Sequence, residues 1–365
     1  MTSFQETSMR FVLACLSVTS ALALGANALA QQAAPKPVAN GPLTEQQAAS
    51  GQFRQVDQGT SIKAGAEPHF AAARKAAGND FPGLLLLCNQ ARPEALRWAL
   101  PSAKVLRQGP LQEGEKPRPA KLFDNLYYLG APNVSAYAID TSDGIILIDT
   151  LNNGKEAEDV IAGGLRQLGL DPARIKHVII THGHGDHYGG AAWLQKTYHP
   201  SVWMSDLDWT LSPTTLDKPY FDPAPPRDKV ITDGQVLKLG QQSVTMHFTP
   251  GHTQGTVSLI FSVSDHGKPH KVALLGGTGF NFPHSPLRFA QYAATMGHFA
   301  DLARKAGANV ILSNHPENDL VVAKSIAITR RKAGEPNALV AGVGGVQRYF
   351  TTLNQCALAY GEQMK

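Results

Sequence analysis

The sequence predicts an α+β protein in which two mixed β-sheets pack against each other and helices flank them. Two observations support this prediction. Short apolar stretches pair across tight turns, as the strands of β-hairpins do. Longer helical patterns lie between and after these pairs, so the helices are expected outside the sheets. The 365 residues allow one large core plus an extension.

The first half of the expected core alternates strands with helices. Four short stretches are apolar, or alternate apolar with polar residues, which is typical of strands. These strands are expected at residues 126–129, 134–139, 145–148 and 178–180. Helices are expected at 155–168, where Gly169 ends the pattern, and at 189–198.

The second half consists of two expected hairpins and two long helices. The hairpins join 236–239 to 244–248, and 257–263 to 272–275. A helix over 287–305, a strand at 310–312 and a closing helix over 346–360 complete the pattern. We therefore expect the folded core to occupy residues 121–365.

The first thirty residues have the pattern of a secretory signal peptide. Arg10 supplies a positive charge, residues 11–24 are almost unbroken apolar sequence, and Ala28-Leu29-Ala30 forms a cleavage site. The apolar run is too short for a membrane-spanning helix. A lipoprotein with Cys15 as the lipidated residue is disfavoured by the short stretch before it. We therefore expect cleavage near Ala30, a periplasmic or secreted chain, and no stable membrane insertion.

Residues 31–120 form an expected N-terminal extension that is partly disordered. Up to about residue 66 it is rich in Ala, Gln, Pro and Gly and lacks apolar periodicity. Residues 69–99 look partly helical, and a connector containing Pro and Gly follows. Signal cleavage leaves two cysteines, Cys88 and Cys356, and an oxidising compartment favours a disulfide between them. Two buried free thiols are the alternative.

The composition argues against one class of partner and draws attention to histidine. The net charge is +4, and no basic stripe with interleaved aromatic residues occurs, so nucleic acid is not expected as a partner. Thirteen histidines accompany only three cysteines. Because histidine is the commonest metal ligand in proteins, the places where histidines gather are candidate metal sites.

Four potential metal ligands gather in one short loop. The apolar strand at 178–180 leads into a segment with the order Thr-His-Gly-His-Gly-Asp-His. The candidate ligands are His182, His184, Asp186 and His187. The two glycines allow backbone angles that other residues avoid, so the loop can direct four side chains toward one region. Imidazole nitrogen together with carboxylate oxygen suits zinc.

Two further histidines follow strand ends. His252 lies in a Pro-Gly-His-Thr turn after the strand at 244–248, and His315 lies in an Asn-His-Pro segment after the strand at 310–312. A lone histidine in such a loop is more often a capping or surface residue. The four ligands above need partners to complete two sites, however, and loops at strand ends commonly carry functional residues. We therefore expect His252 and His315 to complete them.

The loop 182–187, the turn 250–253 and the late His315 resemble the metallo-β-lactamase superfamily. The resemblance extends from about Phe123 to the C-terminus and includes the strand that ends at Asp149. It implies the αββα sandwich of that superfamily, a zinc-dependent hydrolase, and a small-molecule carbonyl substrate.

By the same resemblance, two Zn²⁺ ions bind to this chain. The first takes His182, His184 and His252, and the second takes Asp186, His187 and His315. A hydroxide shared by the metals is the implied nucleophile, because zinc lowers the pKa of bound water to about 7. The resemblance also implies Asp186 and His252 as catalytic residues. Asp149 resembles the superfamily's carboxylate that orients the ligand loop. An ordinary turn residue at a strand end is the alternative for Asp149.

The segment after the strand at 272–275 differs among members of the superfamily. Glyoxalase-, lactonase- and nuclease-like members carry a bridging Asp there, and two β-lactamase subclasses carry a Cys ligand. This chain has Gly276-Gly277-Thr278-Gly279 instead. That segment resembles the third β-lactamase subclass, whose sites use only His and Asp. Thr278 and Asn281 are the candidates to bind a substrate carboxylate.

These features predict hydrolysis of a β-lactam amide, and with it a role in antibiotic resistance. Phe280 and Phe282 predict a more apolar cleft wall than is usual in that subclass, and the extension is long enough to reshape the cleft. The same metal site acting on another ester, lactone or amide is therefore the alternative. A third hypothesis, a zinc-binding protein without catalysis, is disfavoured by the complete set of six ligands. The sequence makes no prediction of the oligomeric state.

Overall fold

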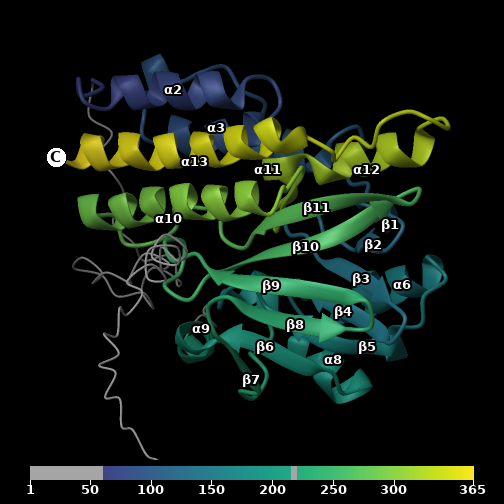
Figure 1. Ribbon diagram of the computed structural model, residues 1–365. Coiled ribbons are helices and arrows are strands. Elements are labelled where there is room, and N and C mark those ends of the chain that lie inside the picture. The colour runs from purple at the N-terminus through teal and green to yellow at the C-terminus, as the bar shows by residue number, and fades with distance from the viewer. Residues whose placement is uncertain (1–60, 215–219) are drawn as a thin grey trace, which may run out of the picture. The chain divides into compact units, whose positions relative to one another are not determined.

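Two β-sheets packed face to face form the centre of the protein, with helices on both outer sides (Figure 1). This computed structural model describes residues 61–214 and 220–365. The predicted signal peptide, its cleavage near Ala30 and the segment 31–60 lie outside the described residues. Within the described residues, the predicted fold class is confirmed.

The first sheet has seven strands in chain order, and its first four run antiparallel while the rest run parallel to β4. The strands are β1 (Ala120–Phe123), β2 (Leu126–Tyr128), β3 (Tyr137–Thr141), β4 (Gly144–Ile148), β5 (Ile175–Ile179), β6 (Ser201–Ser205) and β7 (Lys229–Ile231). Side chains alternate between the two faces of a strand. In β4, Ile146 and Ile148 enter the core between the sheets, and Ile145 and Leu147 enter the core beneath the outer helices.

The second sheet has five strands in the order β12-β11-β10-β9-β8. The strands are β8 (Gln235–Leu239), β9 (Gln242–Phe248), β10 (Val257–Asp265), β11 (Lys268–Leu275) and β12 (Val310–Ser313). Both predicted hairpins are present, as β8–β9 and β10–β11, and β12 pairs parallel to β11. Met246, Leu259 and Leu274 of this sheet pack against the isoleucines of β4 in the central core.

Helices cover the outer face of the first sheet. The predicted helix at 155–168 forms as α5 (Gly154–Glu156), a π-helical segment η2 (Ala157–Ala162) and α6 (Gly163–Gln167), and Gly169 follows with φ 78°. The next helix forms as α7 (Gly185–Tyr188) and α8 (Ala191–Tyr198). Ile161, Leu165 and Leu194 from these helices bury against β4 and β5.

A second helical layer covers the outer face of the five-stranded sheet. It contains α10 (Pro286–Lys305) and α13 (Gly342–Met364), which pack against each other, and α2 (Glu67–Ala77) and α3 (Pro82–Gln90), which pack against α13. Ser285 starts α10 by accepting a hydrogen bond from the Arg288 backbone, with Pro286 in the first turn. Ile260, Ala273 and Ile311 supply the sheet side of this core.

The N-terminal extension joins this layer. The Cys88–Cys356 disulfide is present and links α3 to α13. The expected connector contains α4 (Ala103–Gln108), whose N-terminus is capped by the Ser102 hydroxyl. The remaining elements are η1 (Glu94–Leu96), η3 (Pro172–Arg174), α9 (Asp206–Leu211), η4 (Ser212–Thr214), α11 (Pro316–Asp319) and α12 (Val321–Arg330). Among the described residues, no helix is both long enough and apolar enough to cross a membrane.

Candidate metal centre

The six predicted ligands meet at one edge of the packed sheets. The loop after β5, which continues into α7, carries His182, His184, Asp186 and His187. His252 follows β9, and His315 follows β12. Strands β9 and β11 both run antiparallel to β10, and β12 runs parallel to β11, so the carboxyl ends of β9 and β12 lie at the same end of their sheet.

The first group consists of His182, His184 and His252, all buried. The His182 Nε2 atom lies 3.1 Å from His184 Nδ1 and 3.0 Å from His252 Nε2. The third separation, between His252 Nε2 and His184 Nδ1, is 3.1 Å. Three nitrogens that bind one zinc ion in tetrahedral geometry lie roughly 3.3 Å apart, so this spacing fits a zinc ion.

The second group consists of Asp186, His187 and His315. The Asp186 Oδ2 atom lies 3.5 Å from His187 Nε2 and 3.8 Å from His315 Nε2. The His187 Nε2 atom is buried and finds no hydrogen-bond partner among the described residues. An orphaned buried nitrogen is costly unless something fills its place. A metal ion between these three side chains would fill it.

The outward ring nitrogens are hydrogen-bonded to acceptors. His182 Nδ1 donates to the Gly276 carbonyl at 2.7 Å, His252 Nδ1 to the Gly279 carbonyl at 2.8 Å, and His315 Nδ1 to the Asn133 carbonyl at 2.8 Å. A carbonyl only accepts, so each of these Nδ1 atoms carries the proton. The Nε2 lone pair of each ring is therefore available to a metal.

Asp149 binds the ligand loop at two places. Its carboxylate accepts from the Thr181 backbone at 2.8 Å and from the Thr181 hydroxyl at 2.9 Å, and it also accepts from His187 Nδ1 at 2.9 Å. The residue is fully buried and has φ 58°, a conformation that costs a non-glycine residue energy. Asp149 thus lies where the resemblance predicts a loop-orienting carboxylate.

Two charged residues that the sequence analysis did not single out hold the ligand loops. Buried Asp208 accepts from the Gly183 backbone at 3.0 Å and from the Thr253 hydroxyl at 2.8 Å, so it ties the loop after β5 to the turn after β9. Buried Arg288 of α10 donates through Nε to the Gly251 carbonyl at 2.8 Å. Both anchors fix the position of His252 relative to His182.

The electrostatics of the site favour metal binding. Burial, reinforced by the neighbouring imidazoles, lowers the pKa of His182 and of His252 well below the usual value, so both rings stay neutral. Burial also opposes ionisation of Asp186, but the imidazoles of His187 and His315 outweigh it and lower the pKa of that carboxyl. Neutral imidazoles and an ionised carboxylate are the forms that bind zinc.

The backbone after β11 has no room for a further ligand. A Cβ atom on Gly276 would lie 1.8 Å from the Val257 carbonyl oxygen, and one on Gly277 would lie 2.7 Å from the His252 Cβ. Neither position can carry an Asp or Cys side chain without moving its neighbours. The candidate ligands of this centre, among the described residues, are therefore His and Asp alone.

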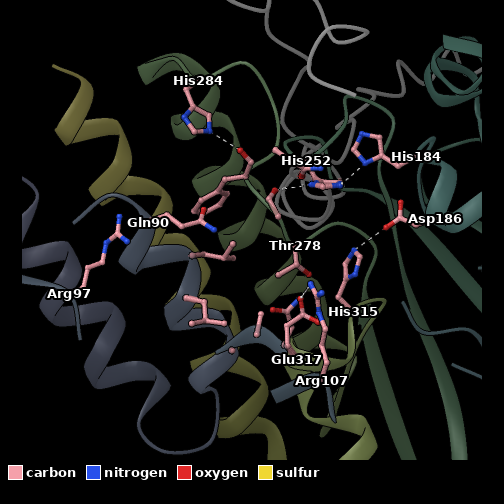
Figure 2. Close-up of a pocket in the computed structure, with 18 residues that line it drawn as sticks. Gln90, Arg97, Arg107, His184, Asp186, His252, Thr278, His284, His315 and Glu317 are labelled. Atoms are coloured by element: carbon pink, nitrogen blue, oxygen red, sulfur yellow. Dashed lines mark hydrogen bonds and ion pairs between the residues drawn. The ribbon is translucent and has the colours of Figure 1, made fainter. Parts of the chain in front are cut away.

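A cleft of about 540 Å³ opens onto the ligands (Figure 2). Clefts of this size accommodate small-molecule substrates. Thr278 and Asn281 both line it, and Asn281 is exposed, whereas the buried Thr278 hydroxyl is 3.3 Å from the Ser313 hydroxyl. Phe280 also lines the cleft. The prediction for Phe282 is wrong, because its ring is fully buried among aromatic side chains of α10.

The extension forms the opposite wall of the cleft. Leu86, Leu87 and Gln90 of α3 line it together with Arg97 and Arg107. None of these residues had a sequence signal that points to the site, because only the folded chain brings them opposite the histidines.

The protein is an αββα sandwich with a candidate binuclear metal centre. One group of three His and one group of two His and one Asp lie at the shared edge of its two sheets. Residues 129–265 match the model of the metallo-beta-lactamase superfamily. Over this segment the chain is similar to the hydrolases of that superfamily.

Known proteins similar to this chain differ in their activities. The structure of BJP-1, a subclass B3 metallo-beta-lactamase of Bradyrhizobium japonicum, aligns with a TM-score of 0.55 and 27% identity, over 65% of this chain and 90% of that chain. A hydroxyacylglutathione hydrolase of Acidiphilium cryptum is 26% identical over 224 residues, 59% of this chain and 80% of that protein. An uncharacterized protein of Aquifex aeolicus is 28% identical over 134 residues, 35% of this chain, and the match spans 59% of its length.

Proposed function

We propose that this protein is a zinc-dependent hydrolase that holds two zinc ions and cleaves the amide bond of a β-lactam. The observation that carries the proposal is the ligand set: two groups of three side chains, built from His and Asp alone, beside a backbone that excludes a ligand from β11. The similarity to a subclass B3 metallo-beta-lactamase supports this substrate class.

His182, His184 and His252 would hold one zinc ion, and Asp186, His187 and His315 the other. When bound, the ions supply a water of lowered pKa as nucleophile and polarise the substrate carbonyl. Three protein ligands per ion leave room for water and substrate. Asp186 and His252 line the cleft, so the metals that they would hold face the space open to substrate. Asp149 keeps His187 oriented by holding its Nδ1 proton.

The second candidate function is hydrolysis of another ester, lactone or amide at the same centre. The similarity to a hydroxyacylglutathione hydrolase, which extends over 80% of that protein, favours it. The cleft wall built by the extension favours it as well, because specificity within one fold comes from the walls around a shared site.

We also propose that the chain is exported to the periplasm or secreted. The signal-peptide pattern of residues 1–30 supports export. The disulfide supports the same compartment, since disulfides persist in oxidising environments. Hydrolysis of β-lactams in the periplasm would protect the cell from these antibiotics.

The test measures zinc content and turnover on the same purified protein. We expect two zinc ions per chain, hydrolysis of at least one penicillin, cephalosporin or carbapenem, and loss of turnover after treatment with a chelator. Ester and lactone substrates are assayed in parallel.

Each result separates the candidate functions. Two zinc ions with ester or lactone turnover alone would reject the β-lactam proposal in favour of the second function. Two zinc ions without turnover of any carbonyl substrate would favour a non-catalytic zinc-binding protein. Full hydrolytic activity in verified metal-free protein would refute the zinc-dependent mechanism.

A further inference from the structure

The wall opposite the metal ligands comes from the N-terminal extension and carries a cation. Arg107 of α4 lines the cleft, and Figure 2 shows it beside Glu317 and near His315. Its Nη2 atom donates to Glu317 Oε1 at 2.7 Å. The Glu317 side chain is 11% exposed and that of Arg107 36%, so the glutamate is buried behind an arginine that reaches solvent.

The pair with Glu317 leaves part of the guanidinium unused. A guanidinium has five N–H donors in a planar fork, and the contact with Glu317 uses one nitrogen. The Nε atom of Arg107 has no hydrogen-bond partner among the described residues, and neither has Glu317 Oε2. Arg–carboxylate pairs are frequently bidentate, whereas this contact joins one nitrogen to one oxygen. Here one carboxylate oxygen orients the arginine. Because Nε is itself buried, the donors left for another partner are those at the exposed end of the guanidinium.

Arg107 is positively charged. The hydrogen bond to Glu317 raises its pKa, and the negative charge of Asp186 adds to the effect although burial opposes it. Arg107 and Asp186 both line the cleft, so the guanidinium and the second group of metal ligands face the same space. An anion bound between them would meet a cation on the extension side.

Two contacts of α3 fix the position of this wall relative to the metal ligands. At Gly83 in α3, an added Cβ would lie 1.9 Å from the Glu317 carbonyl oxygen, so α3 touches the α11 backbone directly. The disulfide fastens the same helix to α13. Between these two points, Leu86 and Leu87 form the apolar part of the wall. A rigid wall of this kind suits substrate selection, because little has to be ordered on binding.

We propose that the extension determines substrate specificity: Arg107, oriented by Glu317, binds a carboxylate of the substrate, while Leu86 and Leu87 contact its apolar part. The proposal rests on the proposed hydrolase function and names its substrate class as carboxylate-bearing carbonyl compounds. Arginine is suited to this task because its planar fork matches a carboxylate. In this arrangement Arg107, and not Thr278, binds the substrate carboxylate. The Thr278 hydroxyl lies within hydrogen-bonding distance of Ser313.

The test compares matched substrates with and without the carboxylate. A cephalosporin and its methyl ester form one pair, and 4-nitrophenyl hydrogen succinate and 4-nitrophenyl butyrate form another. Arg107→Gln is expected to lower kcat/KM for the anionic member roughly tenfold to a hundredfold, mainly through KM. The neutral member is expected to change by less than about threefold, with zinc content unchanged. Arg107→Lys, which keeps the charge without the fork, is expected to recover part of the loss.

Two controls keep the result interpretable. Arg97→Gln removes the other arginine of the cleft, which is exposed and farther from the ligands in Figure 2, and is expected to have little effect. Arg107→Gln leaves Glu317 without its cation, so the double variant Arg107→Gln/Glu317→Gln is measured as well, with the same loss expected. An equal loss for charged and neutral substrates, or no loss at all, would overturn the proposal.

A binding measurement separates this proposal from the proposed function. If the wild-type protein hydrolyses neither pair, the hydrolase function fails for these substrates. Calorimetric titration with benzylpenicilloate, a dicarboxylate, then decides the role of Arg107. At least tenfold weaker binding to zinc-loaded Arg107→Gln than to the wild type supports it. Equal binding, or no binding to the wild type, rejects it.

Discussion

Asp208 connects two loops that each carry metal ligands. Its buried carboxylate accepts from the Gly183 backbone, between two ligands, and from Thr253, next to a third. Each contact is a hydrogen bond to a charged acceptor in a dry environment, which is stronger than one between neutral groups. The geometry of the first ligand group therefore depends on a residue that does not itself belong to it.

We expect Asp208→Asn to weaken zinc binding roughly tenfold to a hundredfold, because partners that position metal ligands contribute on that scale. The measurement is competition for zinc against a chelator of known affinity, with circular dichroism as a check on folding. Asp206→Asn is the matched control, since Asp206 lies on the same helix, is exposed and pairs with Arg227. Unchanged zinc affinity in a folded Asp208→Asn protein would contradict the assigned positioning role.

At the residue scale, the ligands and the loop-orienting Asp149 were predictable from the sequence, and Asp208 was not. His182 to His187 form a dense local pattern after an apolar strand, so one window of sequence contains most of the signal. Asp208 acts through Thr253, 45 residues away, and Arg107 is oriented by Glu317, 210 residues away. A single Asp or Arg has no local pattern, and its role follows only from tertiary contacts. For the same reason, Phe282 was expected in the cleft although it packs in the core.

At the scale of elements, the disulfide adds a covalent link to the packing of α3 on α13. Cys88 and Cys356 are both fully buried, and they join segments 268 residues apart. A cross-link between distant segments restricts the unfolded chain, and such bonds typically contribute roughly 2–4 kcal/mol. The bond also fixes the helix that carries Leu86 and Leu87 beside the cleft.

We expect peptide mapping of denatured, unreduced protein to find Cys88 and Cys356 unlabelled by a thiol reagent, and both labelled after reduction. The double variant Cys88→Ser/Cys356→Ser should unfold at a lower denaturant concentration, with zinc content retained, because the metal ligands lie on other elements. Free thiols at both positions before reduction would show that the link does not form in the protein.

Elements with a regular pattern were predicted, and some short or atypical ones were not. The hairpins and the long helix α10 have clear alternation or helical spacing, and the structure has them close to the expected bounds. Strand β7 has three residues, too few for a period to show. Helix α12 contains Val321, Val322 and Ile328, β-branched residues that favour strands. Their burial in the core between the sheets overrides that local preference.

At the scale of the whole molecule, the metal groups bridge the two sheets. Each group takes two ligands from the loop after β5 in the first sheet and one from the second sheet, His252 in one case and His315 in the other. A metal ion in either group therefore links the halves of the sandwich. Because ligands bound only by the folded state stabilise it, zinc at a hundredfold excess over its dissociation constant contributes about 2.7 kcal/mol.

The pKa values of the ligand histidines determine whether the folded state gains or loses stability as the pH falls. His182 and His252 have pKa values below that of an unfolded histidine, near 6.5, so below that pH the unfolded chain binds protons that the folded chain does not. Their contribution to stability is present above about pH 6.5 and is lost as the pH falls. Burial lowers the pKa of His187, but Asp186 and Asp149 outweigh it and raise that pKa, which gives one contribution of opposite sign.

We therefore expect zinc removal to lower the thermal unfolding midpoint, and the metal-free protein to lose stability as the pH falls from about 7.5 to 5.5. The zinc-dependent increment should shrink over the same range, because protons compete with zinc for imidazole. Circular dichroism melts with and without chelator, followed by back-titration with zinc, measure both effects. His182→Asn/His252→Asn replaces the two titrating rings with neutral amides, so its metal-free form should show a weaker dependence on pH. Equal midpoints with and without zinc at pH 7.5 would mean that the metal groups do not hold the two sheets together.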